Sequence, residues 1–99
     1  MSEPLNQRNA DAALARADEM AKRLISEGLI SLLEASKFLP PVRGRNVSTS
    51  SVFRWICRGK GGVKLDGIKL HSGLWWTSRE ALIRFAAALT AKAALGAKA

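Results

Sequence analysis

Residues 47–59, with the sequence VSTSSVFRWICRG, constrain the fold more than any other stretch of this chain. Ser48 is a residue type that accepts hydrogen bonds from the free N–H groups of a first helical turn, and Gly59 readily takes the left-handed conformation that ends a helix. At helical spacing, the large apolar side chains share one arc and the small hydroxyls and arginines share the opposite arc. The apolar arc holds Val52, Phe53, Trp55 and Ile56, and the polar arc holds Ser50, Ser51, Arg54 and Arg58. The segment is therefore predicted to be a short helix with one face in a core and a basic face in solvent.

The stretch at 63–77 is predicted to be a basic β-hairpin. Apolar and charged residues alternate from Val63 to Leu70 with the period of a strand, and we expect a bulge where Asp66-Gly67 interrupts the alternation. His71-Ser72-Gly73 forms the tip, and Leu74-Trp75-Trp76 returns as the second strand. The two tryptophans point to opposite faces of such a strand, so one is expected in the core and the other in solvent. Lys60-Gly61-Gly62 supplies the turn before the hairpin.

An N-terminal helix is predicted over residues 8–26, with residues 1–7 disordered and Gly28 as its end. Its apolar stripe is thin and rich in alanine, while acidic and basic residues alternate on the other side. The stripe consists of Ala10, Ala13, Leu14, Ala17, Ala21 and Leu24. Such a stripe is typical of a packing surface or of a seam between two copies, and the pattern leaves both open.

Two capping boxes predict two more helices. Ser31 and Glu34 open a helix through Phe38, which Pro40-Pro41 stops, and Thr77 and Glu80 open a helix to Thr90, after which the Ala/Lys tail is expected to fray. The predicted buried sides are Leu32, Leu33, Ala35, Phe38 and Leu39 in the first, and Ala81, Leu82, Phe85, Ala86 and Leu89 in the second. Phe53, Trp55 and Ile56 are expected to pack against Leu33, Phe38, Leu82 and Phe85.

The basic charge is concentrated in the part of the chain that holds these motifs. The 99 residues carry a net charge of +8, with four Lys or Arg against five Asp or Glu in residues 1–30, and twelve against three in residues 31–99. A cationic surface of this kind is typical of proteins that bind a polyanion. Small basic proteins also bind acidic proteins or anionic membranes, so charge alone does not decide the partner.

Enzymatic chemistry finds little support in the sequence. His71 is the only histidine and Cys57 the only cysteine, so neither a metal-ligand cluster nor a nucleophile–base pair is suggested, and no cofactor, metal or small-molecule substrate is expected. The single cysteine excludes an internal disulfide and fits a reducing cytosol. The start lacks the pattern of a signal peptide and no apolar run reaches the length of a membrane span, so a soluble cytoplasmic protein is expected.

The order of these elements resembles a known group of DNA-binding proteins. The segments VSTSSVFRWICRG, VKLDGIKLHSGLWW and TSREALIRF are similar to the excisionase and MerR-type winged helix-turn-helix superfamily, and closest to small bacterial proteins of an uncharacterised domain family. The resemblance covers residues 29–89. It implies a recognition helix in the major groove, with Thr49, Ser50, Arg54 and Arg58 at the groove, and a wing on the flanking backbone, with Lys69, His71 and Ser72. Two departures from the family pattern are the long connection from Pro40 to Val47 and the stretched strand at Asp66-Gly67.

We therefore expect a mainly α-helical chain with a small β-hairpin, a winged helix-turn-helix domain at 29–90 between an N-terminal helical extension (1–28) and a C-terminal tail (91–99). The leading hypothesis is a sequence-specific double-stranded DNA-binding protein, a transcription regulator or an excisionase-like factor near the nucleoid. The alternative is a protein-interaction module that binds an acidic partner. The N-terminal helix either pairs two copies or folds back on the domain. The residues expected to contact DNA are Arg43, Arg45, Ser48, Thr49, Ser50, Arg54, Arg58, Lys60, Lys64, Lys69, His71 and Ser72.

Overall fold

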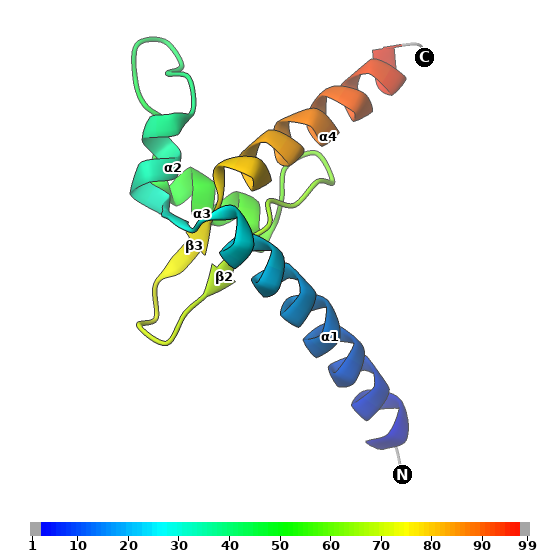
Figure 1. Ribbon diagram of the computed structural model, residues 1–99. Coiled ribbons are helices and arrows are strands. Elements are labelled where there is room, and N and C mark those ends of the chain that lie inside the picture. Colours follow the sequence, from blue (N-terminus) through cyan, green and yellow to red (C-terminus); the bar gives the residue numbers. More distant parts are fainter. Residues whose placement is uncertain (1–2, 98–99) are drawn as a thin grey trace.

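The computed structural model describes residues 3–97, with side chains for residues 9–96, and is mainly helical with a small antiparallel sheet (Figure 1). The sheet order is β1-β3-β2, with Ile30 opposite Thr77 and Ile68 opposite Trp76. Figure 1 shows α1 and α4 leaving the centre in different directions, while the 40–47 loop and the hairpin tip project on the other side. The elements are α1 (Glu3–Glu27), β1 (Ile30–Ser31), α2 (Leu32–Phe38), α3 (Thr49–Cys57), β2 (Ile68–Lys69), β3 (Trp75–Thr77) and α4 (Arg79–Ala97).

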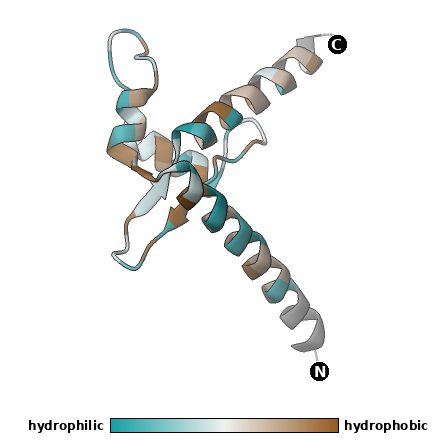
Figure 2. Cartoon of the chain, in the orientation of Figure 1, coloured by the Kyte–Doolittle hydropathy of each residue, from teal (hydrophilic) through white to brown (hydrophobic). Residues whose placement is uncertain are grey.

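The hydrophobic core lies where the helices meet the sheet. Each of the four helices, the strand β1 and the segment before β2 contributes to it, so that short elements stabilise one another by burying apolar area. Figure 2 shows hydrophobic residues on the elements around this centre. The buried apolar residues are Leu24, Ile30, Ala35, Val52, Ile56, Leu65, Ala81, Leu82 and Phe85.

The helix ends predicted around the proline and serine motifs are confirmed. Ser31 Oγ accepts from the Glu34 N–H at 3.1 Å and caps α2, which ends at Phe38 with Leu39 as its C-cap, before the two prolines. Ser48 Oγ accepts from the Ser51 N–H at 3.1 Å and caps α3. Gly59 follows α3 with a φ of 83°, in the left-handed conformation expected of it.

The capping box predicted at Thr77 is wrong by one residue. Thr77 is the last residue of β3 and is buried, with its Oγ1 donating to the Asp66 carbonyl oxygen at 2.7 Å. Ser78 caps α4 instead, because its Oγ accepts from the Ala81 N–H at 2.9 Å. Strand pairing with Ile30 fixes Thr77 in the sheet and moves the start of the helix by one position.

Both outer helices are longer than predicted. The helix α1 begins at Glu3, so the predicted disorder over residues 1–7 is wrong for residues 3–7, while residues 1–2 lie outside the described part. Pro4 falls in the first turn, where its missing N–H costs nothing. The helix α4 continues to Ala97, so the prediction that the helix frays beyond Thr90 is wrong for residues 91–97. Residues 98–99 lie outside the described part. Alanine has the highest intrinsic helix propensity, which explains this extension.

The predicted buried side of α2 is partly wrong. Leu33 and Phe38 are 55% and 44% exposed. Neither belongs to the core around Ile56, in which both were expected. Ala35 and Ser36 are buried in their place. The Ser36 hydroxyl donates a hydrogen bond to the Leu33 carbonyl oxygen at 2.7 Å. Because this bond satisfies the hydroxyl, the small polar side chain of Ser36 can be buried on the inner side of α2. In α4, Ala86 is exposed and not on the buried side as predicted.

The first strand of the hairpin is much shorter than predicted, because only Ile68 and Lys69 pair with β3. The segment before them turns to α3: the Leu65 N–H donates to the Trp55 carbonyl oxygen at 3.0 Å, and the Leu65 side chain enters the core. A backbone group that bonds to a helix end is not available for a strand ladder. The two tryptophans of β3 are both half-buried, so the predicted division into one core and one solvent residue is wrong.

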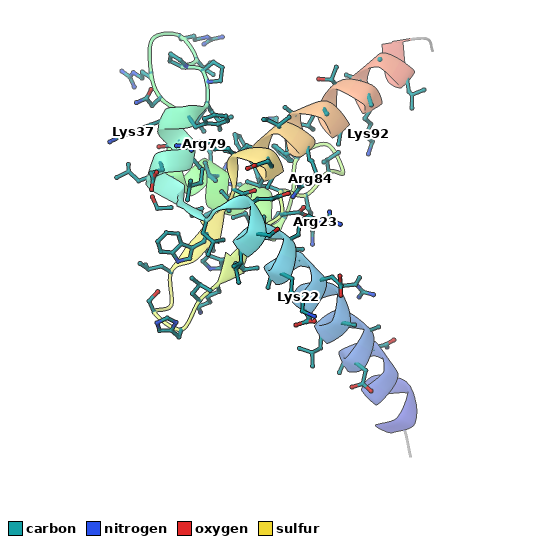
Figure 3. The ribbon with its side chains drawn as sticks, viewed as in Figure 1. Lys22, Arg23, Lys37, Arg79, Arg84 and Lys92 are labelled. Carbon is teal, nitrogen blue, oxygen red and sulfur yellow. The ribbon has the colours of Figure 1, made fainter. Side chains whose placement is uncertain are left out.

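A network of charged side chains joins the end of α1 to α4 and to the segment before β2. Arg84 Nη2 donates to Glu27 Oε1 at 3.3 Å and to Asp66 Oδ2 at 3.2 Å, and Ser78 Oγ donates to Glu27 Oε1 at 2.7 Å. Figure 3 shows Arg84 near the place where α4 and the end of α1 come together. The hydrogen bonds from Arg84 hold the pKa of Glu27 below its ordinary value, against the opposing effect of burial.

The lowered pKa of Glu27 predicts a pH-dependent contribution to stability. A carboxylate with a depressed folded pKa stabilises the fold above its unfolded pKa, and the contribution is lost as the pH falls through the folded pKa. Glu27→Gln should lower the free energy of unfolding at pH 7 by about 1 kcal/mol, a modest value because water screens Arg84, whose side chain is 36% exposed. Urea unfolding of both proteins at a series of pH values measures the difference, which should shrink on acidification. Glu19→Gln, which removes a carboxylate from the exposed part of α1, is the control substitution, and a difference for Glu27→Gln that stays constant into acid would contradict the linkage.

Candidate nucleic-acid interface

The helix α3 has one face fixed in the core and one face open to solvent. Val52 and Ile56 are buried, and the half-buried Trp55 ring stacks on Phe85 with centroids 5.3 Å apart. On the other side, the sequence-predicted residues are exposed together: Thr49, Ser50, Arg54 and Arg58. Because these core contacts fix the orientation of α3, they also determine which of its residues face the solvent.

The outer face of α3 forms a shallow depression with both basic and aromatic walls. Its lining residues are Ser50, Phe53, Arg54, Cys57 and Arg58. Phe53 belongs to the apolar arc predicted from the sequence, but its side chain is 42% exposed. Its ring meets Trp75 of β3 edge to face, with centroids 5.9 Å apart, so the hairpin lies against this edge of α3. The only signal for this in the sequence is that Phe53 stands at one end of the arc.

Ser48 has a different role from its exposed neighbours. Its Oγ accepts from the Ser51 N–H and lies 3.0 Å from Ser51 Oγ. The hydroxyl of Ser48 is therefore used to begin α3, which leaves Thr49 and Ser50 as the hydroxyl residues open on the first turn.

The hairpin places Lys69, His71 and Ser72 in solvent beside α3. The tip is a tight turn in which the Gly73 N–H donates to the Leu70 carbonyl oxygen at 2.8 Å and the Leu70 N–H to the Leu74 carbonyl oxygen at 3.0 Å. Lys69 stands opposite Trp75 in the ladder, and Trp75 contacts Phe53. Two contacts, the strand pair Lys69–Trp75 and the ring contact Trp75–Phe53, thus set the position of the Lys69 backbone relative to α3.

The predicted arginines of the long connection lie apart from the hairpin. Arg43 and Arg45 are exposed on a tight turn closed by hydrogen bonds between Val42 and Arg45, at 2.8 and 3.0 Å. Figure 1 shows this loop beyond the end of α2, on the opposite side of the centre from the hairpin tip. The cations around α3 therefore form separate groups and not one continuous patch.

Lys60 and Lys64 lie at the C-terminal end of α3, on the turn that follows Gly59, and both are exposed. Lys92 of α4 reaches the same turn, where a Cβ built on Gly62 would fall against its Nζ. Nothing in the sequence motifs pointed to Lys92, which lies in the segment expected to fray. The structure thus brings together lysines that are up to 32 positions apart in the sequence, from 60 to 92.

Metal binding has no support among the described residues, which contain no group of three or more His, Cys, Asp or Glu side chains at ligand positions. Cys57 is a free, exposed thiol. Over residues 3–97, no helix combines the length and the apolar character needed to cross a membrane.

Comparisons with known proteins return no relative: no family model, no curated protein and no solved structure matches the chain.

Proposed function

We propose that this protein binds double-stranded DNA in a sequence-specific way, as a winged helix-turn-helix protein that regulates transcription or acts as an excisionase-like factor. In this function α3 enters the major groove and the β2–β3 hairpin lies on the flanking backbone. The observation that carries the proposal is the difference between the two faces of α3. Val52 and Ile56 are buried on one face, and Arg54 and Arg58 are exposed on the other. The function implies a place at the nucleoid in the cytoplasm.

The residue types on the outer face of α3 suit the chemistry of a major groove. The groove is about 12 Å wide and admits one helix, and arginine reaches a guanine edge through two hydrogen bonds. Ser50 is small, so the helix backbone can approach the bases closely next to Arg54. The separate cations at the hairpin and at the Arg43 turn suit phosphates on either side of the groove, where contacts position the protein without reading sequence.

A second candidate is supported by exposed apolar side chains on three of the elements that also carry the exposed cations. Phe53 on α3, Leu74 beside the hairpin tip and Val42 on the long connection are all exposed. Apolar residues inside a basic surface are typical of a site for an acidic protein partner. Such a module would bind polyanions through charge but would show no preference among duplex sequences.

Selection from a randomised duplex pool, followed by sequencing of the retained DNA, tests the proposal. The selected duplex should then bind more tightly than a scrambled duplex of the same length and composition, measured by fluorescence anisotropy at ~0.15 M salt. Specific complexes typically exceed non-specific ones by about a thousandfold or more. Equal affinity for the two duplexes would reject sequence-specific binding and favour the acidic-partner module.

The exposed part of α1 supports a further element of this proposal, the pairing of two copies through their N-terminal helices. Residues 9–19 of α1 are exposed, including Leu14, which is 69% exposed on the alanine stripe. Most of the stability of a helix in a protein comes from packing of its apolar face, so a second copy of the same stripe would stabilise this part of α1. Two copies would then place their α3 helices on half-sites spaced by whole turns of DNA.

Leu14→Glu should convert the dimer to a monomer, because it places a charge in the seam between the two α1 helices. Analytical ultracentrifugation at micromolar protein measures the change. Ala12→Glu adds the same charge on the opposite side of the helix and should leave the dimer intact. A wild type that sediments as a monomer at every concentration tested would contradict the pairing.

A further inference from the structure

The turn after α3 collects positive charge from two distant parts of the chain. Lys60 and Lys64 lie on either side of the glycine pair Gly61-Gly62, and Lys92 reaches the pair from the C-terminal half of α4. The turn rests on α4, since a Cβ on Gly61 would stand 3.7 Å from Leu89 Cδ2. In Figure 3, Lys92 extends from α4 toward this turn.

The glycines are required for this arrangement. Gly61 and Gly62 have φ angles of 59° and 81°, which residues with a side chain rarely adopt. The Lys60 N–H donates to the Val63 carbonyl oxygen at 2.7 Å and closes the turn. A Cβ on Gly62 would take the space in which the Lys92 ammonium lies. The bare turn therefore lets the Lys92 ammonium approach the backbone at Gly62.

Several polar groups at the turn have no protein partner among the described residues. The ion pairs of the described part involve Lys22 and Arg84, so Lys60, Lys64 and Lys92 face no carboxylate there. The N–H groups of Gly61 and Gly62 likewise have no acceptor among those residues. Three ammonium groups and two free N–H groups around one turn match the acceptor oxygens and the negative charge of a phosphate.

We propose that Lys60, Lys64 and Lys92 bind, together with the N–H groups of Gly61 and Gly62, a phosphodiester group of the DNA backbone beyond the C-terminal end of α3. The inference rests on the proposed function and adds Lys92, on α4, to the DNA-binding surface. Gly59 joins the turn directly to the end of α3, and the bond from the Leu65 N–H to the Trp55 carbonyl oxygen holds the far side of the segment on the same helix. The phosphate site and the basic face of α3 are therefore parts of one rigid surface.

The test compares Lys92→Ala with wild type on the selected duplex over a series of salt concentrations. Loss of one phosphate contact should reduce the magnitude of the slope of log K against log salt by about 0.9 and weaken binding by about threefold to tenfold at low salt. The preference for the selected over the scrambled duplex should stay the same, because a phosphate contact does not read bases. Lys92→Arg, which keeps the charge, should restore the slope. Lys22→Ala removes one charge from α1, outside the site, and is the control with an unchanged slope.

Failure of this site and failure of the proposed function give different results. An unchanged slope for Lys92→Ala, with a wild type that prefers the selected duplex, would overturn the phosphate site and leave the function intact. A wild type without preference would reject the function and this inference with it. The amide resonances of Gly61 and Gly62 should shift on addition of duplex, and saturable shifts with inorganic phosphate alone at micromolar concentration would show a free anion as the ligand and overturn the backbone contact.

Discussion

Replacing Arg54 and Arg58 together by Gln should abolish tight binding to the selected duplex and leave the melting temperature nearly unchanged. Both guanidinium groups lie on the exposed face of α3, and exposed charges contribute little to folding stability. Each arginine that reads a base edge contributes about 1–3 kcal/mol of discrimination, so the double variant should lose most of its preference. Anisotropy titrations with selected and scrambled duplexes measure the binding, and thermal unfolding by circular dichroism measures the stability.

A second double variant serves as the control for charge. Lys22→Gln with Lys37→Gln removes the same net charge from α1 and α2, away from the outer face of α3. It should weaken binding slightly to both duplexes and keep the preference. If the arginine variant also keeps its preference, α3 does not read the bases and the assignment of its face to the groove is wrong.

Ile56→Ala should lower the free energy of unfolding by about 2–5 kcal/mol, the range for a buried aliphatic side chain cut back to alanine. Ile56 lies on the buried face of α3 and packs against the backbone at Gly67, where a Cβ would stand 2.6 Å from Ile56 Cδ1. Gly67→Ala alone should therefore cost about 1–3 kcal/mol through overpacking. Urea unfolding of the two variants, compared with wild type, gives these differences.

The combination of the two substitutions separates this close contact from a general loss of stability. In the Ile56→Ala background the new methyl group at 67 enters the space that the isoleucine leaves. The double variant should then be more stable than the sum of the single effects by about 1 kcal/mol or more. Additive costs would mean that α3 and the segment before β2 are not in contact at this point.

The parts of the fold that could be predicted from the sequence are those decided by neighbouring residues. Ser31 and Ser48 each cap the helix that begins at the next residue, by accepting from the N–H three residues ahead, and Gly59 ends α3 with its own backbone conformation. The two faces of α3 follow from a repeat within nine residues. In all of these, the interaction that decides the structure lies within one or two turns of the residue that signals it.

The errors lie where a distant partner decides the structure. Thr77 has the sequence of a helix cap, but pairing with Ile30 holds it in β3. The segment before β2 has the alternation of a strand, but its Leu65 N–H bonds to α3. Arg84 and Glu27 are 57 residues apart, and no local pattern connects them. Likewise Phe53 stands at the border of the apolar arc, and its exposed position beside Trp75 depends on how the hairpin packs against α3.

The contacts of Arg84 with Glu27 and Asp66 bear on the spacing between two half-sites on DNA. They fix the direction in which α1 leaves the body that carries α3. In a pair of copies joined through α1, that direction determines how far apart the two α3 helices stand. The number of base pairs tolerated between half-sites would then depend on a side chain that never touches DNA. Substitution of Arg84 would broaden the accepted spacing while each half-site kept its own sequence.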